Sequence, residues 1–284
     1  MVNSVSDKNI TIVIRGDLFR GCSKTNQSKA LASIVKHAID PLNMPSGNIN
    51  VVAIANEHDD LEGYKKIIGD IFKDYNFNLW PRGPSSQVHG FIDCFNIVNN
   101  HYAGLFENIL GVLVLRLDLY FFSDIDYTRI SPDKILMQWN LLGSKSTGHM
   151  PDQIQYIGGN LIHNFIHTIN NSRIDTSWPG TLHNMFNYCT KHFGSDKISY
   201  LNYYDDPKPN WDNCPIRGNP GILMGNPLFT YTRYLQTGEG IPYTTEWKYF
   251  GHDNELEVER ILKEHRECLK NNIRINIKND TSQT

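Results

Sequence analysis

The most apolar stretch of the chain is GVLVLRLDLYFFSDID, residues 111–126, and it carries Arg116 and Asp118 where the apolar run ends. Burying an unpaired carboxylate or guanidinium group costs several kcal/mol, so charged residues usually stand where a strand leaves the core. The stretch therefore predicts a buried strand whose end meets a ligand or an ion. The alternative is an ion pair between Arg116 and Asp118 that seals the edge of the sheet.

The residues before and around this stretch alternate short β-rich runs with helical patterns. Strands are expected at 10–16, 48–56, 77–80 and 111–119, and helices at 25–40, 61–72 and 89–106. Each apolar strand after the first follows a helix, which is the pattern of parallel strands joined by crossover helices. The expected fold class is α/β, with a Rossmann-like, mostly parallel central sheet flanked by helices.

The second half of the chain is less regular. It predicts a strand at 133–143 and helices at 152–169, 182–193 and 253–272. The segment 203–227 is too rich in proline and glycine for a regular element, and it is expected to form a pocket wall or lid. We expect one domain over residues 1–252, in two halves at about 10–130 and about 131–252. An amphipathic helix and a polar tail, 253–284, follow it.

Composition excludes several classes of protein. A net charge of −3 gives no global basic field, which argues against a nucleic-acid-binding protein. The longest apolar run, 109–115, is far shorter than the roughly twenty residues of a spanning helix. The five cysteines show no paired spacing, and the first nine residues are polar, so we expect reduced thiols, no secretory signal and a cytoplasmic location.

A short loop with two arginines follows the first predicted strand. The segment RGDLFRG, residues 15–21, places Arg15, Asp17 and Arg20 around Gly16 and a second glycine. Its backbone and arginines are suited to holding a phosphate or a base, although it lacks the Gly-Lys-Ser/Thr ending of a P-loop. The alternative is a surface turn with solvated charges.

A second polar segment, NEHDD at 56–60, follows the second predicted strand. Ligands of open parallel sheets bind outside the carboxyl ends of the strands, so Asn56 is a candidate binding residue. The acids Asp59 and Asp60 are equally suited to capping the helix that follows.

Asp118 is the candidate metal ligand, because a carboxylate at a strand end suits a hard divalent cation that also takes oxygens from a diphosphate. The literal D-x-D string at 124–126 competes for this role but lies in a more polar context.

His163 and His167 are spaced one helical turn apart, which is a metal-ligand spacing. A zincin helix has a glutamate directly after the first histidine, and Asn164 stands there, so these histidines are more simply read as packed or half-exposed side chains.

Taken together, the stretches ITIVIRGDLFRG, NINVVAIANEHDD, VLVLRLDLYFFSDI and MPDQIQYIGGNLIHNFI resemble nucleotide-sugar glycosyltransferases of the GT-A fold. Such proteins occur in polysaccharide loci and in large DNA viruses, and for a viral protein the expected location is the host cytoplasm. The resemblance covers roughly residues 10–170. It matches Arg15 and Gly16 to the donor loop, and Arg116 and Asp118 to an Arg-x-Asp variant of the D-x-D motif. It also matches Asp152 and Tyr156 to the acceptor side, and it implies a donor half at about 10–130 and an acceptor half at about 131–252.

This resemblance implies transfer of a sugar from a nucleoside-diphosphate donor, expected to be UDP-linked, to a hydroxyl group of a glycan or glycoprotein. It implies Mn²⁺ or Mg²⁺ at Asp118 and a general base at Asp152, whose alternative role is to cap the helix expected at 153–169. The expected donor-binding residues are Arg15, Gly16, Asp17, Arg20, Asn56, Arg116 and Asp118.

Two other functions remain open at this point. Tyr120 stands where a second D-x-D acid is expected, which favours a catalytically inactive protein that binds a nucleotide or glycan. A zinc-dependent hydrolase that uses His163 and His167 is the third reading. The apolar side of the helix at 253–272 is suited to forming a homodimer.

Overall fold

The chain is described here by a computed structural model, which comprises two compact units. The described residues are 8–16, 24–56, 61–83, 87–121, 124–137, 154–171, 189, 191–201 and 229–231. The first unit holds the central sheet, and the second holds a helix and a two-stranded sheet. The expected boundary at residue 252 lies outside the described residues.

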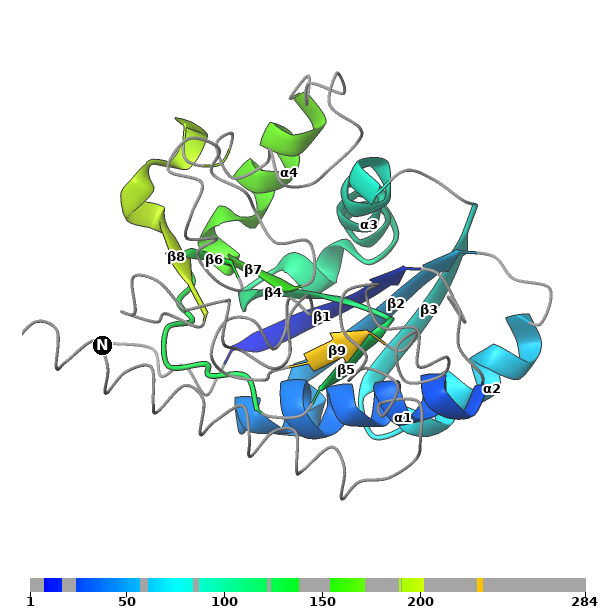
Figure 1. Cartoon of the computed structure of the whole chain (residues 1–284). Helices are drawn as coiled ribbons and strands as arrows, with labels where there is room; N and C mark the ends of the chain where they lie inside the picture. The colour runs from blue at the N-terminus through cyan, green and yellow to red at the C-terminus, as the bar shows by residue number, and fades with distance from the viewer. Residues whose placement is uncertain are drawn as a thin grey trace, which may run out of the picture. The chain divides into compact units, whose positions relative to one another are not determined.

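A seven-stranded sheet forms the centre of the first unit (Figure 1). Its strands are β1 (Asn9–Gly16), β2 (Ile49–Asn56), β3 (Asn76–Arg82), β4 (Ile109–Arg116), β6 (Ile135–Met137), β7 (Ile154–Gly158) and β8 (Ile198–Tyr200). The strand order is β3-β2-β1-β4-β7-β6-β8, and β7 alone runs antiparallel to its neighbours. The expected mostly parallel α/β sheet is therefore confirmed.

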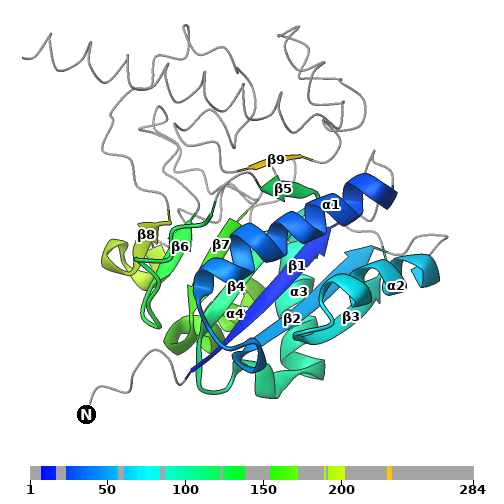
Figure 2. The same cartoon turned by 90° about the horizontal axis from the view of Figure 1, so that it is seen from below.

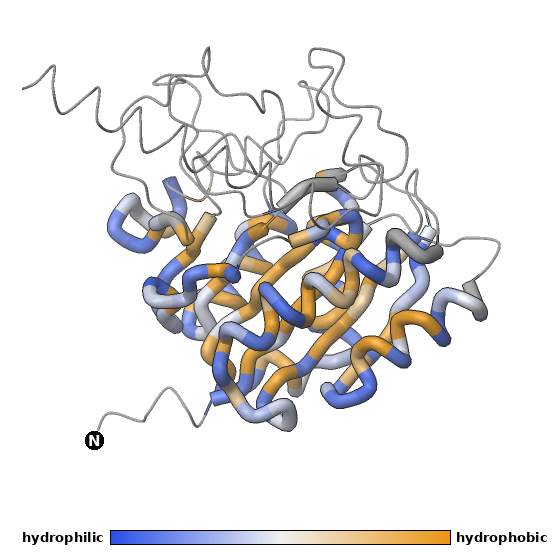
Figure 3. The backbone as a smooth tube through the Cα atoms, turned by 60° about the horizontal axis from the view of Figure 1, so that its bottom comes forward, coloured by the Kyte–Doolittle hydropathy of each residue, from blue (hydrophilic) through white to orange (hydrophobic). Residues whose placement is uncertain are grey.

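The central strands are apolar on both faces. In β1, Ile10, Ile12 and Ile14 point to one face and Thr11 and Val13 to the other, and all of them are buried. Strands that are covered on both faces read as continuous hydrophobic runs, which is typical of parallel sheets. Figure 3 shows the same apolar character along the inner strands.

Helices cover both faces of this sheet. They are α2 (Leu61–Ile71), α3 (Gln87–His101) and α4 (Ile162–Asn171). Helices α3 and α4 lie on one face and α2 on the opposite face (Figures 1 and 2). Phe91 and Phe95 of α3 meet Phe165 of α4 edge to face or tilted, and on the other face Phe72, just past α2, stacks on Phe77 of β3. These aromatic contacts fix the helices on the sheet.

The second unit contains α1 (Lys24–Ile34), β5 (Leu119–Phe121) and β9 (Phe229–Tyr231). Strands β5 and β9 pair antiparallel, and α1 continues into a π-helical turn, Val35–Ile39. The Ser33 hydroxyl accepts a hydrogen bond from the backbone N–H of Phe121, at 2.9 Å, which ties α1 to β5. The stretch expected as one strand at 111–119 is therefore two strands, because the chain turns at residues 117–118.

The helix expected at 152–169 is wrong in its first half. Residues 154–158 form β7, which is buried between β4 and β6, and α4 begins only at Ile162. Gly158 and Gly159 separate the two elements, and at each of them a Cβ atom would clash with backbone, of Pro132 and Ile109 respectively. The close approach of these backbones requires glycine, and the sheet position overrides the helical spacing.

The third strand is longer than expected. Pro81 does not end β3, which continues to Arg82 and pairs with β2 along its whole length. Proline lacks the N–H donor that a strand ladder needs, so within sheets it is tolerated mainly on edge strands, and β3 is one of the two edge strands of this sheet. Strand β8 was not expected, and only residues 189 and 191–193 of the helix expected at 182–193 are described.

No helix in the described ranges combines the length and apolar character needed to cross a bilayer.

Candidate functional site

The carboxyl ends of β1 and β4 lie side by side. Arg15 and Arg116 are register partners in these two parallel strands, and the backbone N–H of Leu117 donates to the carbonyl oxygen of Arg15 at 2.8 Å. Val13 and Val114, two residues earlier in each strand, belong to the core under α3 and α4. Because side chains alternate along a strand, both arginines lie on the face that α3 and α4 cover.

Arg15 is a buried cation. Its side chain is 6% exposed, and its guanidinium carbon lies 5.3 Å from the centre of the Phe91 ring on α3. A guanidinium group over an aromatic face gains about 0.5–2 kcal/mol, more when it is desolvated. This contact holds the positive charge at the carboxyl edge of the sheet.

Gly16 ends β1 with a φ of 137°, a backbone conformation that residues with a Cβ atom rarely adopt. The space is not limiting, because a Cβ atom there would meet Leu117 at ordinary van der Waals distance. Glycine is therefore required by the turn of the chain out of the strand.

Asn56 and Arg82 end the next two strands. They are register partners at the carboxyl ends of β2 and β3, and both are partly buried. Arg82 forms an ion pair with Asp93 of α3, with 3.3 Å between Nη2 and Oδ2. The sequence analysis missed Arg82, because it expects this strand to end at residue 80, before Pro81; proline is tolerated on an edge strand, but the local sequence does not show which strand is at the edge.

Arg15 and Arg82 act on the same buried thiol. Burial raises the pKa of Cys94 from 9.0 to about 11, and the positive charges of Arg15 and Arg82 oppose that rise. Two guanidinium groups from β1 and β3 therefore contribute to the potential at one point on α3. Together with Arg116, they place three cations at the ends of three parallel strands.

Asp118 belongs to the second unit and is 4% exposed. It follows Leu117 directly and precedes β5, in which Tyr120 is partly buried and pairs with β9. A carboxylate buried to this degree requires a cationic or hydrogen-bonding environment. Both readings of the sequence, a metal ligand and an ion-pair partner, predict such burial.

Both acids of the D-x-D string at 124–126 form hydrogen bonds with other side chains or with the backbone. Asp124 contacts His37 at 2.7 Å within the second unit. Asp126 is exposed and accepts a hydrogen bond from the backbone N–H of Thr128 at 2.9 Å, a bond that lowers the pKa of its carboxyl group. Asp126 therefore has a local role in a turn, as aspartates often do.

His163 and His167 are exposed on the outer side of α4. The side-chain nitrogen of Asn171 lies 3.1 Å from Nδ1 of His167. In the ranges that the structure describes, no group of three or more His, Cys, Asp or Glu side chains is placed to hold a metal ion. The described residues thus add no ligand to this histidine pair.

The remaining candidates lie in two places. Asp17, Arg20 and Asp152 are outside the described residues. The capping role considered for Asp152 is wrong, since the next described residues form β7 and not a helix. The expectation that Tyr156 lines an acceptor site is also wrong: it is fully buried, and its hydroxyl donates to the carbonyl oxygen of Leu110 at 2.7 Å.

No family model and no curated protein matches this sequence. Among solved structures, the glycosyltransferase GlyE of Streptococcus pneumoniae TIGR4 is similar, with 13% identity and a TM-score of 0.43 over 68% of this chain and 45% of GlyE. The galactosyltransferase LgtC, in complex with donor and acceptor sugar analogs, has 9% identity and a TM-score of 0.39, over 67% of this chain and 72% of LgtC.

TarS of S. aureus has 12% identity and a TM-score of 0.44, over 69% of this chain and 35% of TarS. The chain therefore spans less than half the length of GlyE and of TarS. At these identities and TM-scores the similar structures carry no argument about the candidate site, which is described from its own geometry alone.

Proposed function

We propose that the chain is a glycosyltransferase of the GT-A type, which moves a sugar from a UDP-linked donor to a hydroxyl group of a glycan or glycoprotein. The observation that carries this proposal is the pair of register-matched arginines, Arg15 and Arg116, at the adjacent ends of β1 and β4. Open parallel sheets bind their ligands outside these ends. The resemblance of residues 10–170 to nucleotide-sugar glycosyltransferases supports the same conclusion.

The arginines have an electrostatic role in this proposal. When the bond between sugar and phosphate breaks, negative charge grows on the departing diphosphate, and fixed positive groups lower the energy of that state. Arg15 and Arg116 supply the charge from two strands, with Arg20 of the following loop as a third candidate. Gly16, Asp17 and Asn56 complete the expected donor-binding set.

Asp118 is the residue that would hold Mn²⁺ or Mg²⁺. Magnesium-type sites commonly use one or two carboxylates together with substrate phosphates, so a single buried carboxylate fits this chemistry. A bound divalent cation supplies charge neutralisation on the diphosphate. The tyrosine at position 120 leaves Asp118 as the one acid of the expected motif.

Asp152 is the proposed general base. As the acceptor oxygen attacks the anomeric carbon, its proton passes to a carboxylate oxygen of Asp152, and the bond from the sugar to the diphosphate breaks. This role rests on the resemblance to the family.

The proposal is tested by release of nucleoside diphosphate. The purified chain is incubated with manganese, a panel of nucleotide sugars and glycan acceptors. Removal of a key electrostatic group typically lowers turnover by about 10²–10³-fold, and we expect Asp118→Asn to do so. Asp126→Asn is the matched control, because an asparagine oxygen can still accept the hydrogen bond from Thr128.

A catalytically inactive binding protein is the second candidate, favoured by Tyr120. It predicts that a nucleoside diphosphate raises the melting temperature while no donor of the panel is turned over. A ligand present at 100 times its Kd adds about 2.7 kcal/mol of stability, which thermal unfolding detects readily.

Full turnover in Asp118→Asn would remove Asp118 from the metal role.

A further inference from the structure

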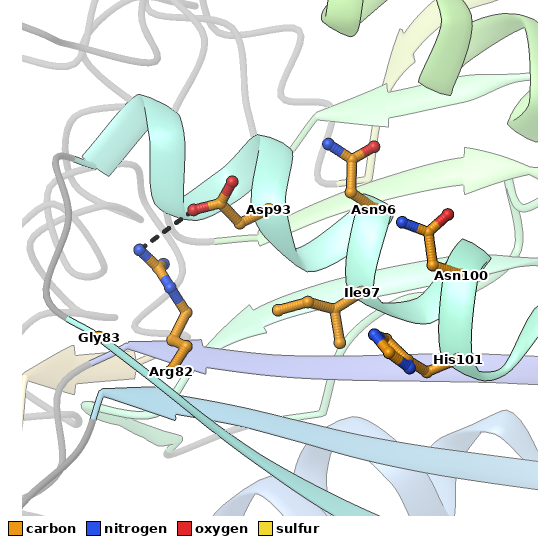
Figure 4. A pocket seen from close by; sticks show the side chains of 7 residues that line it. All are labelled: Arg82, Gly83, Asp93, Asn96, Ile97, Asn100 and His101. Carbon is orange, nitrogen blue, oxygen red and sulfur yellow. Dashed lines mark ion pairs between the residues drawn. The ribbon is translucent and has the colours of Figure 1, made fainter.

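A polar groove lies along α3, beside the carboxyl end of the edge strand β3. It has a volume of about 330 Å³ and is lined by α3 and by the end of the edge strand β3. Small-molecule sites have volumes of about 300–1,000 Å³, so the groove is large enough for a small ligand. Figure 4 shows Arg82 of β3 facing Asp93 of α3, with the other lining side chains further along the helix.

The groove exists because α3 has two different sides. The residues of α3 buried in the core are Val88, Phe91, Cys94, Phe95 and Val98. A second stripe, Asp93, Asn96, Ile97, Asn100 and His101, lines the groove. Spacings of three and four residues place each set along one side of a helix. The second stripe carries five groove residues, of which only Ile97 is aliphatic.

The charges that line the groove compensate each other. Arg82 and Asp93 are joined at 3.3 Å, and their side chains are 12% and 45% exposed. An anionic ligand would meet the carboxylate of this pair, and a cationic ligand would meet its guanidinium group. The paired charges therefore favour a neutral ligand, toward which the guanidinium N–H groups can donate and the carboxylate can accept.

The two asparagines add both donors and acceptors. Each side-chain amide has two N–H donors and a carbonyl oxygen with two lone pairs. Asn96 forms a reciprocal pair with Asn170 of α4, at 2.9 and 2.8 Å, which fixes the orientation of its amide. This pair uses one donor and one lone pair of Asn96, so the amide has a second donor and a second lone pair that a ligand can use. A ligand rich in hydroxyl groups, which both donate and accept, matches such a lining.

The groove also has a small apolar part. Ile97 contacts the core, and the ring of His101 lies on Trp80 of β3 with the ring centres 4.1 Å apart. The flat His101 ring is thus held in place by the indole. Aliphatic and aromatic surface of this size can cover the C–H groups of one sugar ring and remove them from water.

We infer that this groove binds a neutral saccharide. The proposal goes beyond the transferase activity: none of the groove residues belongs to the expected donor-binding set, and only Arg82 is also one of the cations at the strand ends. Arg82 and Asp93 form hydrogen bonds with neighbouring hydroxyl groups, Asn96 and Asn100 orient the ring, and Ile97 and His101 cover its apolar face.

The test uses NMR on the full-length, ¹⁵N-labelled chain without nucleotide or metal. Maltose, lactose and cellobiose are titrated separately, and inorganic phosphate is titrated as the anionic probe. We expect at least one disaccharide to shift the side-chain amide signals of Asn96 and Asn100 in a saturable way. No shift with any of the three sugars, or stronger shifts with phosphate, would overturn the proposal.

Matched variants test the position of the groove. Asn100 and His101 are exposed, so Asn100→Ala and His101→Ala should leave the fold intact. Each is expected to raise the Kd of the bound sugar about tenfold, which corresponds to about 1.4 kcal/mol. Asn164→Ala, on the exposed side of α4, is the control and should leave the Kd unchanged. Equal affinity in wild type, Asn100→Ala and His101→Ala would contradict the proposal.

Discussion

The bodies and the ends of β1 and β4 differ sharply in chemistry. From Ile10 to Ile14 and from Leu110 to Leu115 the two strands are buried on both faces, and only Thr11 breaks the apolar run of β1. Each strand then ends in a positively charged residue or next to one, and these residues, Arg15 and Arg116, are register partners. The bodies of the strands hold the sheet together through burial, whereas their ends carry positive charge. Stability and ligand binding should therefore respond separately to substitution.

The largest expected effect is on the body of β4. Leu113→Ala removes a fully buried side chain, and substitutions of this kind cost about 2–5 kcal/mol through lost burial and the cavity that remains. Urea unfolding measures this loss. If Leu113→Ala unfolds at the same urea concentration as the wild type, the body of the strand does not stabilise the fold as described.

An alkaline pH should lower the free energy of unfolding through Cys94 of α3, the buried thiol that Arg15 and Arg82 influence. Since burial raises the pKa of Cys94 to about 11, the thiol stays protonated in the folded chain while it ionises in the unfolded chain above about pH 9. The stability that this thiol contributes is full below pH 9 and decreases as the pH rises to 11, on the order of 2 kcal/mol.

The measurement is urea unfolding at several pH values in wild type and in Cys94→Ala. The variant lacks the titrating thiol, so its stability should fall less steeply between pH 9 and 11. Identical slopes for the two proteins would rule out Cys94 as a source of the pH dependence.

The end of β4 should affect binding more than stability. Arg116→Met keeps most of the side-chain volume but removes the charge, so we expect the unfolding free energy to change by less than about 1 kcal/mol. Affinity for UDP in the presence of manganese should fall at least tenfold, or about 1.4 kcal/mol. Calorimetric titration measures it, and a variant that binds UDP as tightly as the wild type would separate Arg116 from the donor site.

The smallest expected effect concerns Asp126, beyond the strand end. Asp126→Ala removes the hydrogen bond to the backbone N–H of Thr128 and should cost about 0.5–1.5 kcal/mol, without changing UDP affinity. Because that bond lowers the pKa of Asp126, its contribution is present above the ordinary carboxyl pKa and is lost as the pH falls through the lowered value. A loss of manganese-dependent UDP binding in Asp126→Ala would instead assign the metal to this string.

The sequence predicts the first half of the fold well because local pattern and tertiary position agree there. Strands β1 and β2 and helices α2 and α3 lie within a few residues of their expected bounds. In 152–169 the two disagree: Ile154, Ile157 and Leu161 have helical spacing, but a position between β4 and β6 makes residues 154–158 a strand. Local periodicity cannot report which strands will be neighbours.

The same distinction applies to the site. Strand ends can be predicted from the sequence, which places Arg15 and Arg116 at the ends of β1 and β4. In the structure these two residues are register partners. Arg82 was missed because a proline such as Pro81 usually ends a strand. Proline is tolerated on an edge strand, but which strand lies at the edge depends on the whole sheet and not on the local sequence. The resemblance matched Tyr156 to the acceptor side, whereas its position in β7 puts its ring in the core.

The central claim is that the charged ends of β1 and β4 serve a nucleoside diphosphate. It is tested most directly by a crystal soaked with UDP and manganese, in which anomalous scattering locates the metal. The account predicts one manganese ion bound to the Asp118 carboxylate and a diphosphate in contact with Arg15 and Arg116. A nucleotide bound elsewhere, or an Asp118 carboxylate closed off from the metal by a protein cation, would contradict it.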